Sequence, residues 1–241
     1  MRSIAPRLAP LLLLAAACYR SSDAPPATPA PPAGPPPTLA WAEHNFETTR
    51  LPAASADGTA ILLGLQANDG GRGNANFRFE LRDRSDARIA GHSVLTVDEF
   101  DQIQGPDGKL LGIDERITAA NRWLAEQHTA RRFAPLTELP VETGPEITVP
   151  FRATGGGVTL EWRANRVTIT EGGKQLVARA TPLEWGDQRR QRGSGGDFCE
   201  NAALLNQAWV DLPHKLAVFT VSYSGNDTCW EPSNAPHVIA W

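Results

Sequence analysis

Two loops rich in Asn, Asp and Gly carry the side chains best suited to binding chemistry. The first loop contributes Asn68, Asp69 and Arg72, and the second contributes Asn226, Asp227, Trp230 and Glu231. Amides and carboxylates beside an aromatic ring suit a carbohydrate or peptide ligand. Asp/Asn loops also hold Ca²⁺, although no standard calcium spacing is present. The alternative is that these residues simply form turns, because Gly, Asn and Asp are turn formers.

His237 follows the second loop and allows a catalytic interpretation. Asp227 or Glu231, acting with His237, would supply the acid and base of an envelope hydrolase if these groups converge in a pocket. Ordinary catalytic signatures are missing from the sequence, among them S-x-x-K, HExxH and a phosphate loop. The histidines also lack metal-ligand spacing. We therefore expect no metal and no cofactor, and a non-catalytic binding or structural module is the preferred interpretation.

Cys199 and Cys229 are expected to form a disulfide. In an oxidising compartment two cysteines that have no other role usually pair. Closing a loop of about 30 residues stabilises the fold by about 3.5 kcal/mol on the chain-entropy model. The alternative is a reactive thiol at Cys199, but no helix start, nearby histidine or CxxC spacing favours it.

The third cysteine, Cys18, stands directly behind an export signal at residues 1–17. Arg2 and Arg7 make the beginning of the chain positive, and an apolar run from Leu8 to Ala17 follows. This run is shorter than the roughly 20 residues that a membrane-spanning helix needs.

The segment resembles the signal of bacterial lipoproteins, whose motif reads Leu, small, small, Cys. Here Ala15 stands in the place of the leucine, and Leu14 lies one position further out. The resemblance implies cleavage before Cys18 and lipidation of its thiol, and Tyr19 instead of Asp favours the outer membrane. Two or more acyl chains hold a protein firmly, at about 0.8 kcal/mol per buried CH₂. The alternative is a plain secretory signal with a chance cysteine.

Residues 18–38 predict a tether that begins at the lipidated cysteine. Eight of the seventeen residues from Ser21 to Pro37 are proline. Such a segment prefers the extended polyproline II conformation, at about 3.1 Å per residue, and acts as a spacer. A ligand for an aromatic groove is the alternative for a proline-rich tract.

The charge balance argues against a polyanionic partner. The chain has 23 Lys and Arg against 27 Asp and Glu, a net charge of −4. Loss of Arg2 and Arg7 with the signal makes the mature chain more acidic still. We therefore expect no nucleic-acid binding. The expected partners are the membrane, through the lipid anchor, and an envelope protein or glycan.

Residues 39–241 are predicted to form a single β-rich α+β domain with antiparallel sheets and meanders. Strand patterns occur at 59–67, 74–83 and 87–97, and a three-stranded meander is predicted at 157–180. Within the meander, Ala164-Asn165 predicts a turn and Gly172-Gly173 predicts a tight hairpin, because glycine tolerates positive φ.

One main helix is predicted at about 114–132. Asp114 is the expected N-cap, and Ile117, Ala120, Leu124 and His128 share one face. On that face His128 is expected to be a packed histidine, with a ligand role as the alternative. The segment ENAALLNQA, residues 200–208, allows a second, shorter helix.

The segments 57–81 and 214–241 share an order of approach turn, apolar strand, polar loop and return strand. Either the domain contains two similar halves, or these are simply two long hairpins. At pattern level, residues 55–240 also resemble secreted bacterial domains of unknown function. That resemblance implies no catalytic residues.

Overall fold

The computed structural model describes residues 34–66, 74–144, 150–182, 191–192, 200–224 and 235–241. The chain divides into two compact units between Pro31 and Pro32, and all of the described residues belong to the second unit. Within them, antiparallel strands predominate and two helices are present. The predicted β-rich α+β fold is confirmed.

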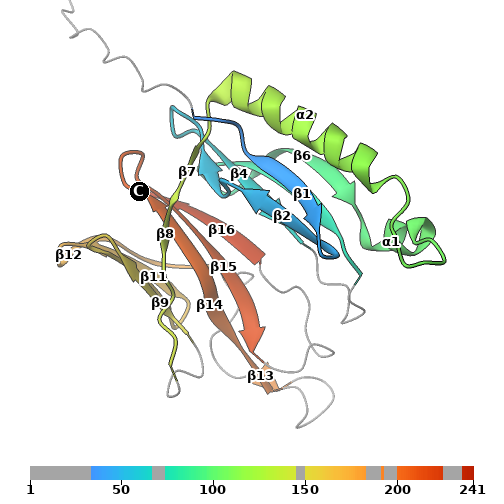
Figure 1. Cartoon of the computed structure of the whole chain (residues 1–241). Helices are drawn as coiled ribbons and strands as arrows, with labels where there is room; N and C mark the ends of the chain where they lie inside the picture. Colours follow the sequence, from blue (N-terminus) through green and yellow to red (C-terminus); the bar gives the residue numbers. More distant parts are fainter. Residues whose placement is uncertain (1–33, 67–73, 145–149, 183–190, 193–199, 225–234) are drawn as a thin grey trace, which may run out of the picture. The chain divides into compact units, whose positions relative to one another are not determined.

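The first sheet has five strands in the order β6-β5-β4-β3-β7 (Figure 1). The strand bounds are β3 Ala53–Ala54, β4 Ala60–Leu65, β5 Phe77–Asp83, β6 Arg88–Leu95 and β7 Ala134–Pro135. β4 is buried on both faces because its sequence AILLGL places apolar side chains on each of them. The strands predicted at 59–67, 74–83 and 87–97 are confirmed as β4, β5 and β6.

Helix α2, Ile113–Arg131, packs against one face of the first sheet. The predicted stripe is confirmed, since Ala120, Leu124 and His128 are buried. The N-cap prediction was wrong: Gly112 is the N-cap, in a left-handed conformation, and Asp114 lies inside the first turn. A carboxylate there still stabilises the helix, because it faces the positive end of the helix dipole.

A second helix, α1, covers Val97–Ile103 and begins with a capping box. The Thr96 hydroxyl accepts a hydrogen bond from the Glu99 N–H, and the Glu99 carboxylate accepts one from the Thr96 N–H. The Thr-x-x-Glu signature of this start is visible in the sequence. The prediction of a single strand over 87–97 overlooked this helix start.

Strands β1 (Thr38–Ala42) and β2 (Asn45–Thr49) form a separate two-stranded sheet. The side-chain amide of Asn121 on α2 accepts from the Leu39 N–H at 2.8 Å and donates to the Leu39 carbonyl at 2.9 Å. One polar side chain thereby attaches the edge of this hairpin to the helix.

The second sheet follows the order β13-β14-β15-β16 (Figure 1). β8 also pairs with β14, on the side opposite β15. The bounds are β8 Thr137–Leu139, β13 Gln191–Arg192, β14 Glu200–Asp211, β15 Leu216–Ser224 and β16 Ala235–Ala240. The segments 57–81 and 214–241 thus supply antiparallel pairs, β4–β5 and β15–β16, to different sheets.

The short helix considered at 200–208 is absent, because these residues belong to β14. Ala, Leu, Glu and Gln favour a helix locally, but tertiary pairing overrides such propensities. β14 pairs along its length with β15, and a register shift between Leu205 and Gln207 breaks the simple alternation of a strand.

The third sheet has the order β12-β11-β10-β9. Its bounds are β9 Arg152–Gly155, β10 Val158–Arg163, β11 Arg166–Glu171 and β12 Lys174–Ala180. The predicted meander and both of its turns are confirmed. Ala164 and Asn165 have φ of 50° and 56°, and Gly172 and Gly173 have φ of 54° and 81°.

The second sheet packs on both of its faces. Toward the third sheet, Phe219 and Val221 join a cluster that includes Trp162, whose Nε1–H donates to the Thr181 hydroxyl at 3.2 Å. Toward the first sheet, Leu216 and Val218 join a cluster with residues of β3 and β4. The three sheets are therefore held together by two apolar cores that share the second sheet.

The turn before β4 meets the turn between β14 and β15 at a single close contact. Gly58 has φ of +66°, and a Cβ at this position would lie 2.5 Å from the His214 ring. Gly172 has a similar φ of +54°, but a Cβ there would meet nothing within 4 Å.

We expect Gly58→Ala to destabilise the protein more than Gly172→Ala. Both variants incur about 1–2 kcal/mol for a left-handed alanine. The first variant adds about 1–3 kcal/mol because the imidazole must move. Denaturant midpoints of the two variants measure the difference, and equal losses would contradict the packing of His214 on Gly58.

Candidate functional site

Most of the residues predicted to form a site lie outside the described residues. The predicted site residues that are not described are Cys18, Asn68, Asp69, Arg72, Cys199, Asn226, Asp227, Cys229, Trp230 and Glu231. The polar-loop site, the disulfide and the hydrolase pairing of Asp227 or Glu231 with His237 therefore stay predictions.

His237 is described, and it lies buried in β16. Its Nδ1 is 3.5 Å from the Asp86 carboxylate, and its ring centroid is 5.7 Å from that of Phe219. His214 has a different neighbour, because its Nδ1 is 2.7 Å from the Asp211 carboxylate. His237 and His214 therefore lie in different surroundings, and each has a different carboxylate beside it.

A cluster of Glu80, Arg82 and Asp86 joins the β5–β6 hairpin to the edge of β16. The Arg82 guanidinium donates to both carboxylates at 2.8 Å and also to the Pro236 carbonyl at 2.8 Å. Asp86 accepts from the Val238 N–H at 3.0 Å. Backbone groups on the edge of the second sheet are thereby paired, which an exposed edge strand otherwise lacks.

The electrostatics of this cluster are those of a structural ion pair. Burial raises the pKa of Glu80, but hydrogen bonds and charge from Arg82 and Arg78 outweigh it and hold that pKa below its ordinary value. A carboxyl that stays ionised among its partners is poorly suited to proton transfer near neutral pH. We assign the cluster a structural role.

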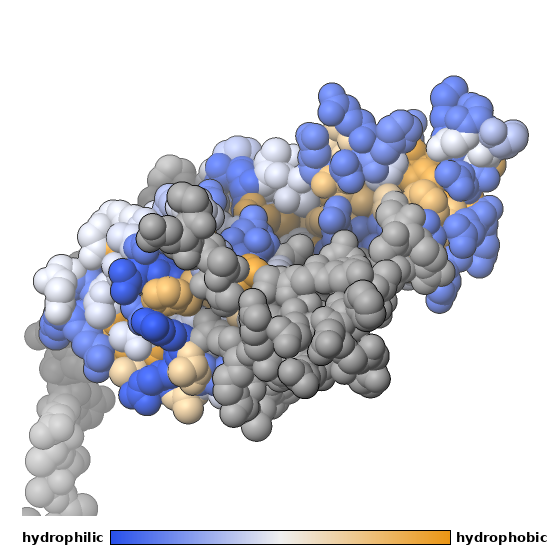
Figure 2. Space-filling view, turned by 90° about the horizontal axis from the view of Figure 1, so that it is seen from below, coloured by the Kyte–Doolittle hydropathy of each residue, from blue (hydrophilic) through white to orange (hydrophobic). Residues whose placement is uncertain are grey.

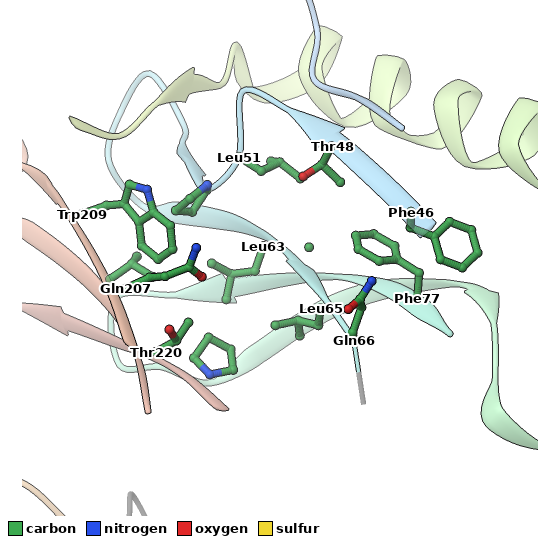
Figure 3. A pocket seen from close by; sticks show the side chains of 14 residues that line it. Phe46, Thr48, Leu51, Leu63, Leu65, Gln66, Phe77, Gln207, Trp209 and Thr220 are labelled. Atoms are coloured by element: carbon green, nitrogen blue, oxygen red, sulfur yellow. The ribbon is translucent and has the colours of Figure 1, made fainter. Parts of the chain in front are cut away.

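A cavity of about 290 Å³ lies between the first and second sheets, beside β2 (Figure 3). β2 pairs with β1, and β3 pairs with β4 at only two positions, so the cavity opens where β2 and β4 separate. Its lining comprises Phe46, Thr48, Leu51, Pro52, Leu63, Gly64, Leu65, Gln66, Phe77, Gln207, Trp209, Val218, Thr220 and Pro236.

The cavity has an apolar base, aromatic rings on opposite sides and neutral polar groups. In Figure 3, Trp209 lies across the space from Phe46 and Phe77, and Leu63 and Leu65 lie between them. Gln66, Gln207 and Thr48 are exposed residues, so they mark its solvent side. None of the described lining residues is ionisable.

Thr220 lines the cavity, but its hydroxyl is buried in the wall. The residue is 7% exposed, and its Oγ1 has no hydrogen-bond partner among the described residues. The described polar side chains that a ligand can reach are those of the exposed residues Thr48, Gln66 and Gln207, and the lining otherwise offers apolar contact.

Sequence reasoning did not find this cavity. Its walls come from residues 46–77 and 207–236, which are far apart in the chain and read locally as strand core. The register shift beside Gln207 is a local signal of irregularity. A bulge does not reveal which distant strand will face it.

Outside this cavity, the described surface shows few further features that suggest a binding site. In the view of Figure 2, the described surface is mainly hydrophilic, and its hydrophobic residues form small separate patches. In the described chain, no three His, Cys, Asp or Glu side chains gather as metal ligands would. None of the described helices is long and apolar enough to cross a bilayer.

Comparisons with protein-family models, curated proteins and solved structures give no match.

The structural role of Glu80 predicts a pH-dependent loss of stability. A lowered folded-state pKa gives stability that is present above the unfolded value of about 4.5 and is lost as the pH falls through the folded value. Glu80→Gln should therefore cost about 1–3 kcal/mol at pH 7, and the difference from the parent should narrow below about pH 4.5.

Denaturant unfolding between pH 7 and pH 3 measures this effect. The matched control is Glu161→Gln, because Glu161 pairs with Arg152 at 3.1 Å in a more exposed setting, where an ion pair contributes below about 1 kcal/mol. A Glu80→Gln deficit that does not change with pH would count against the assignment.

Proposed function

We propose that this protein is a lipid-anchored lipoprotein of the bacterial cell envelope whose globular part is a non-catalytic binding module. The observation that carries the binding role is the cavity itself, whose described lining combines apolar side chains with the neutral, exposed residues Thr48, Gln66 and Gln207. Binding pockets typically combine an apolar lining with a few placed polar groups. The described lining supplies no ionisable acid or base, so it supports binding better than hydrolysis.

The lining also restricts the ligand class. A charged group placed in this cavity would lose its hydration and find no opposite charge among the described lining residues. A pure hydrocarbon would make no hydrogen bond to the side chains of Thr48, Gln66 and Gln207. The fitting ligand is therefore neutral and largely apolar, with at least one hydrogen-bonding group.

The proposed location rests on the first eighteen residues. A short apolar run behind two arginines ends at Cys18, and the proline-rich tether follows directly. Lipidation at this point would hold the module at a membrane, and Tyr19 favours the outer membrane.

Cys18→Ser should move the protein from the membrane fraction to the soluble fraction, or leave it as an unprocessed precursor. The reason is that the thiol carries the acyl chains that bind the bilayer. Fractionation followed by mass measurement of the mature protein reads both outcomes. Ser21→Ala is the control and should remain membrane-bound and acylated; unchanged retention of Cys18→Ser would contradict the anchor.

Benzamide, a neutral ring that carries one amide, tests the cavity. Saturation-transfer NMR on the full mature protein should show contact with this probe. Thr48→Trp should reduce the signal at least about tenfold, because the indole fills space on the β2 side of the cavity. Glu47→Trp is the control, since Glu47 is an exposed neighbour that does not line the cavity. Equal signals from both variants would contradict a cavity site.

A further inference from the structure

We infer that the ligand of this cavity is an extended, uncharged peptide segment that adds as a strand to the open edge of β4. This inference rests on the proposed binding function and names its ligand class. Three features of the described residues support it: the edge of β4 that lacks a strand partner, the neutral amides of Gln66 and Gln207, and a described lining without charged residues.

The edge of β4 is open over its second half. β3 pairs with β4 only at Ile61 and Leu62, so Leu63 to Leu65 have no strand partner on that side within the described chain. On its other side β4 is fully paired, because its register with β5 runs from Ala60 to Leu65. The opening is therefore one-sided, as in sheets that accept an added strand.

The direction of the backbone groups follows from one hydrogen bond. The Ala60 carbonyl accepts from the Ser55 N–H at 2.8 Å, so the backbone of Ala60 points away from β5. Successive residues of a strand direct these groups to alternate sides. Leu62 therefore points the same way and meets Ala53, and Gly64 points the same way into the gap.

Gly64 lines the cavity, and no strand of the described chain pairs with its N–H and C=O on that side. An extended peptide would exchange two backbone hydrogen bonds with this residue, as one residue of an antiparallel strand does with its partner. A small ring or an alkyl chain would leave both groups without a strand-like partner.

The walls match the remaining parts of such a peptide. Its apolar side chains would pack on buried Leu63, Leu65 and Val218. Its other amides would reach the side-chain amides of the exposed residues Gln66 and Gln207. The ionisable residues Asp, Glu, Lys and Arg fit poorly, because none of the described lining residues offers an opposite charge.

The test uses acetyl-Val-Thr-Val-Thr-Val-amide, a capped peptide without charge, with the full mature protein. Calorimetry should show saturable binding, and hydrogen exchange should show slower exchange of the Gly64 amide when the peptide is present. Methylation of the peptide's central backbone nitrogen should reduce affinity at least about tenfold, because it removes a donor and blocks the strand edge.

Gln207→Leu tests the wall. This change keeps the approximate size of the side chain and removes the amide, so the affinity for the peptide should fall roughly 3- to 10-fold. Gln175→Leu is the matched control, since Gln175 lies on β12 outside the cavity and should leave binding unchanged.

The outcomes separate this inference from the proposed function. If benzamide contacts the cavity and the peptide does not bind, the cavity takes a small neutral molecule and the strand inference is wrong. Equal binding of the methylated peptide, or unchanged exchange at Gly64, also overturns it. If neither probe binds, the proposed binding function fails as well.

Discussion

Burial of the second sheet on both faces is the constraint on which the structure depends. Successive residues of β15 serve opposite cores: Leu216 and Val218 face the first sheet, whereas Ala217 and Phe219 face the third. Fully burying a side chain of the Val, Leu or Phe type stabilises by about 1.5–3 kcal/mol. Because this strand contributes to two cores, apolar residues fall on both of its faces, and it fixes the positions of the other sheets.

At the edges of the second sheet, outward-facing backbone groups cannot pair within the sheet and need other hydrogen-bond partners. At β16, the Glu80–Arg82–Asp86 cluster supplies the missing partners for Pro236 and Val238. All three side chains are held by ion pairs, because Arg82 pairs with both Glu80 and Asp86, and this keeps the arginine oriented. The same hairpin therefore links two sheets and protects one edge from pairing with other chains.

The cavity arises where this packing is incomplete. β3 is only two residues long, so β4 continues past its neighbour while β2 diverges to pair with β1. Side chains from both sheets close the space without filling it, and Thr220 is left with a buried hydroxyl. The short β3 thus leaves the edge of β4 without a strand partner beside an apolar wall within the described chain.

The sequence by itself determined the local elements, since the hydrophobic period and turn chemistry act over a few residues. The strands β4, β5 and β6, the meander with its turn at Ala164-Asn165, and the buried stripe of α2 were all predictable in this way. The tertiary structure decided what depends on distant partners. It made 200–208 a strand, because β15 pairs with it, and placed His237 beside Asp86. It also brought Gly64 and Thr220 to one cavity. No local pattern encodes these contacts, because each joins segments far apart in the chain.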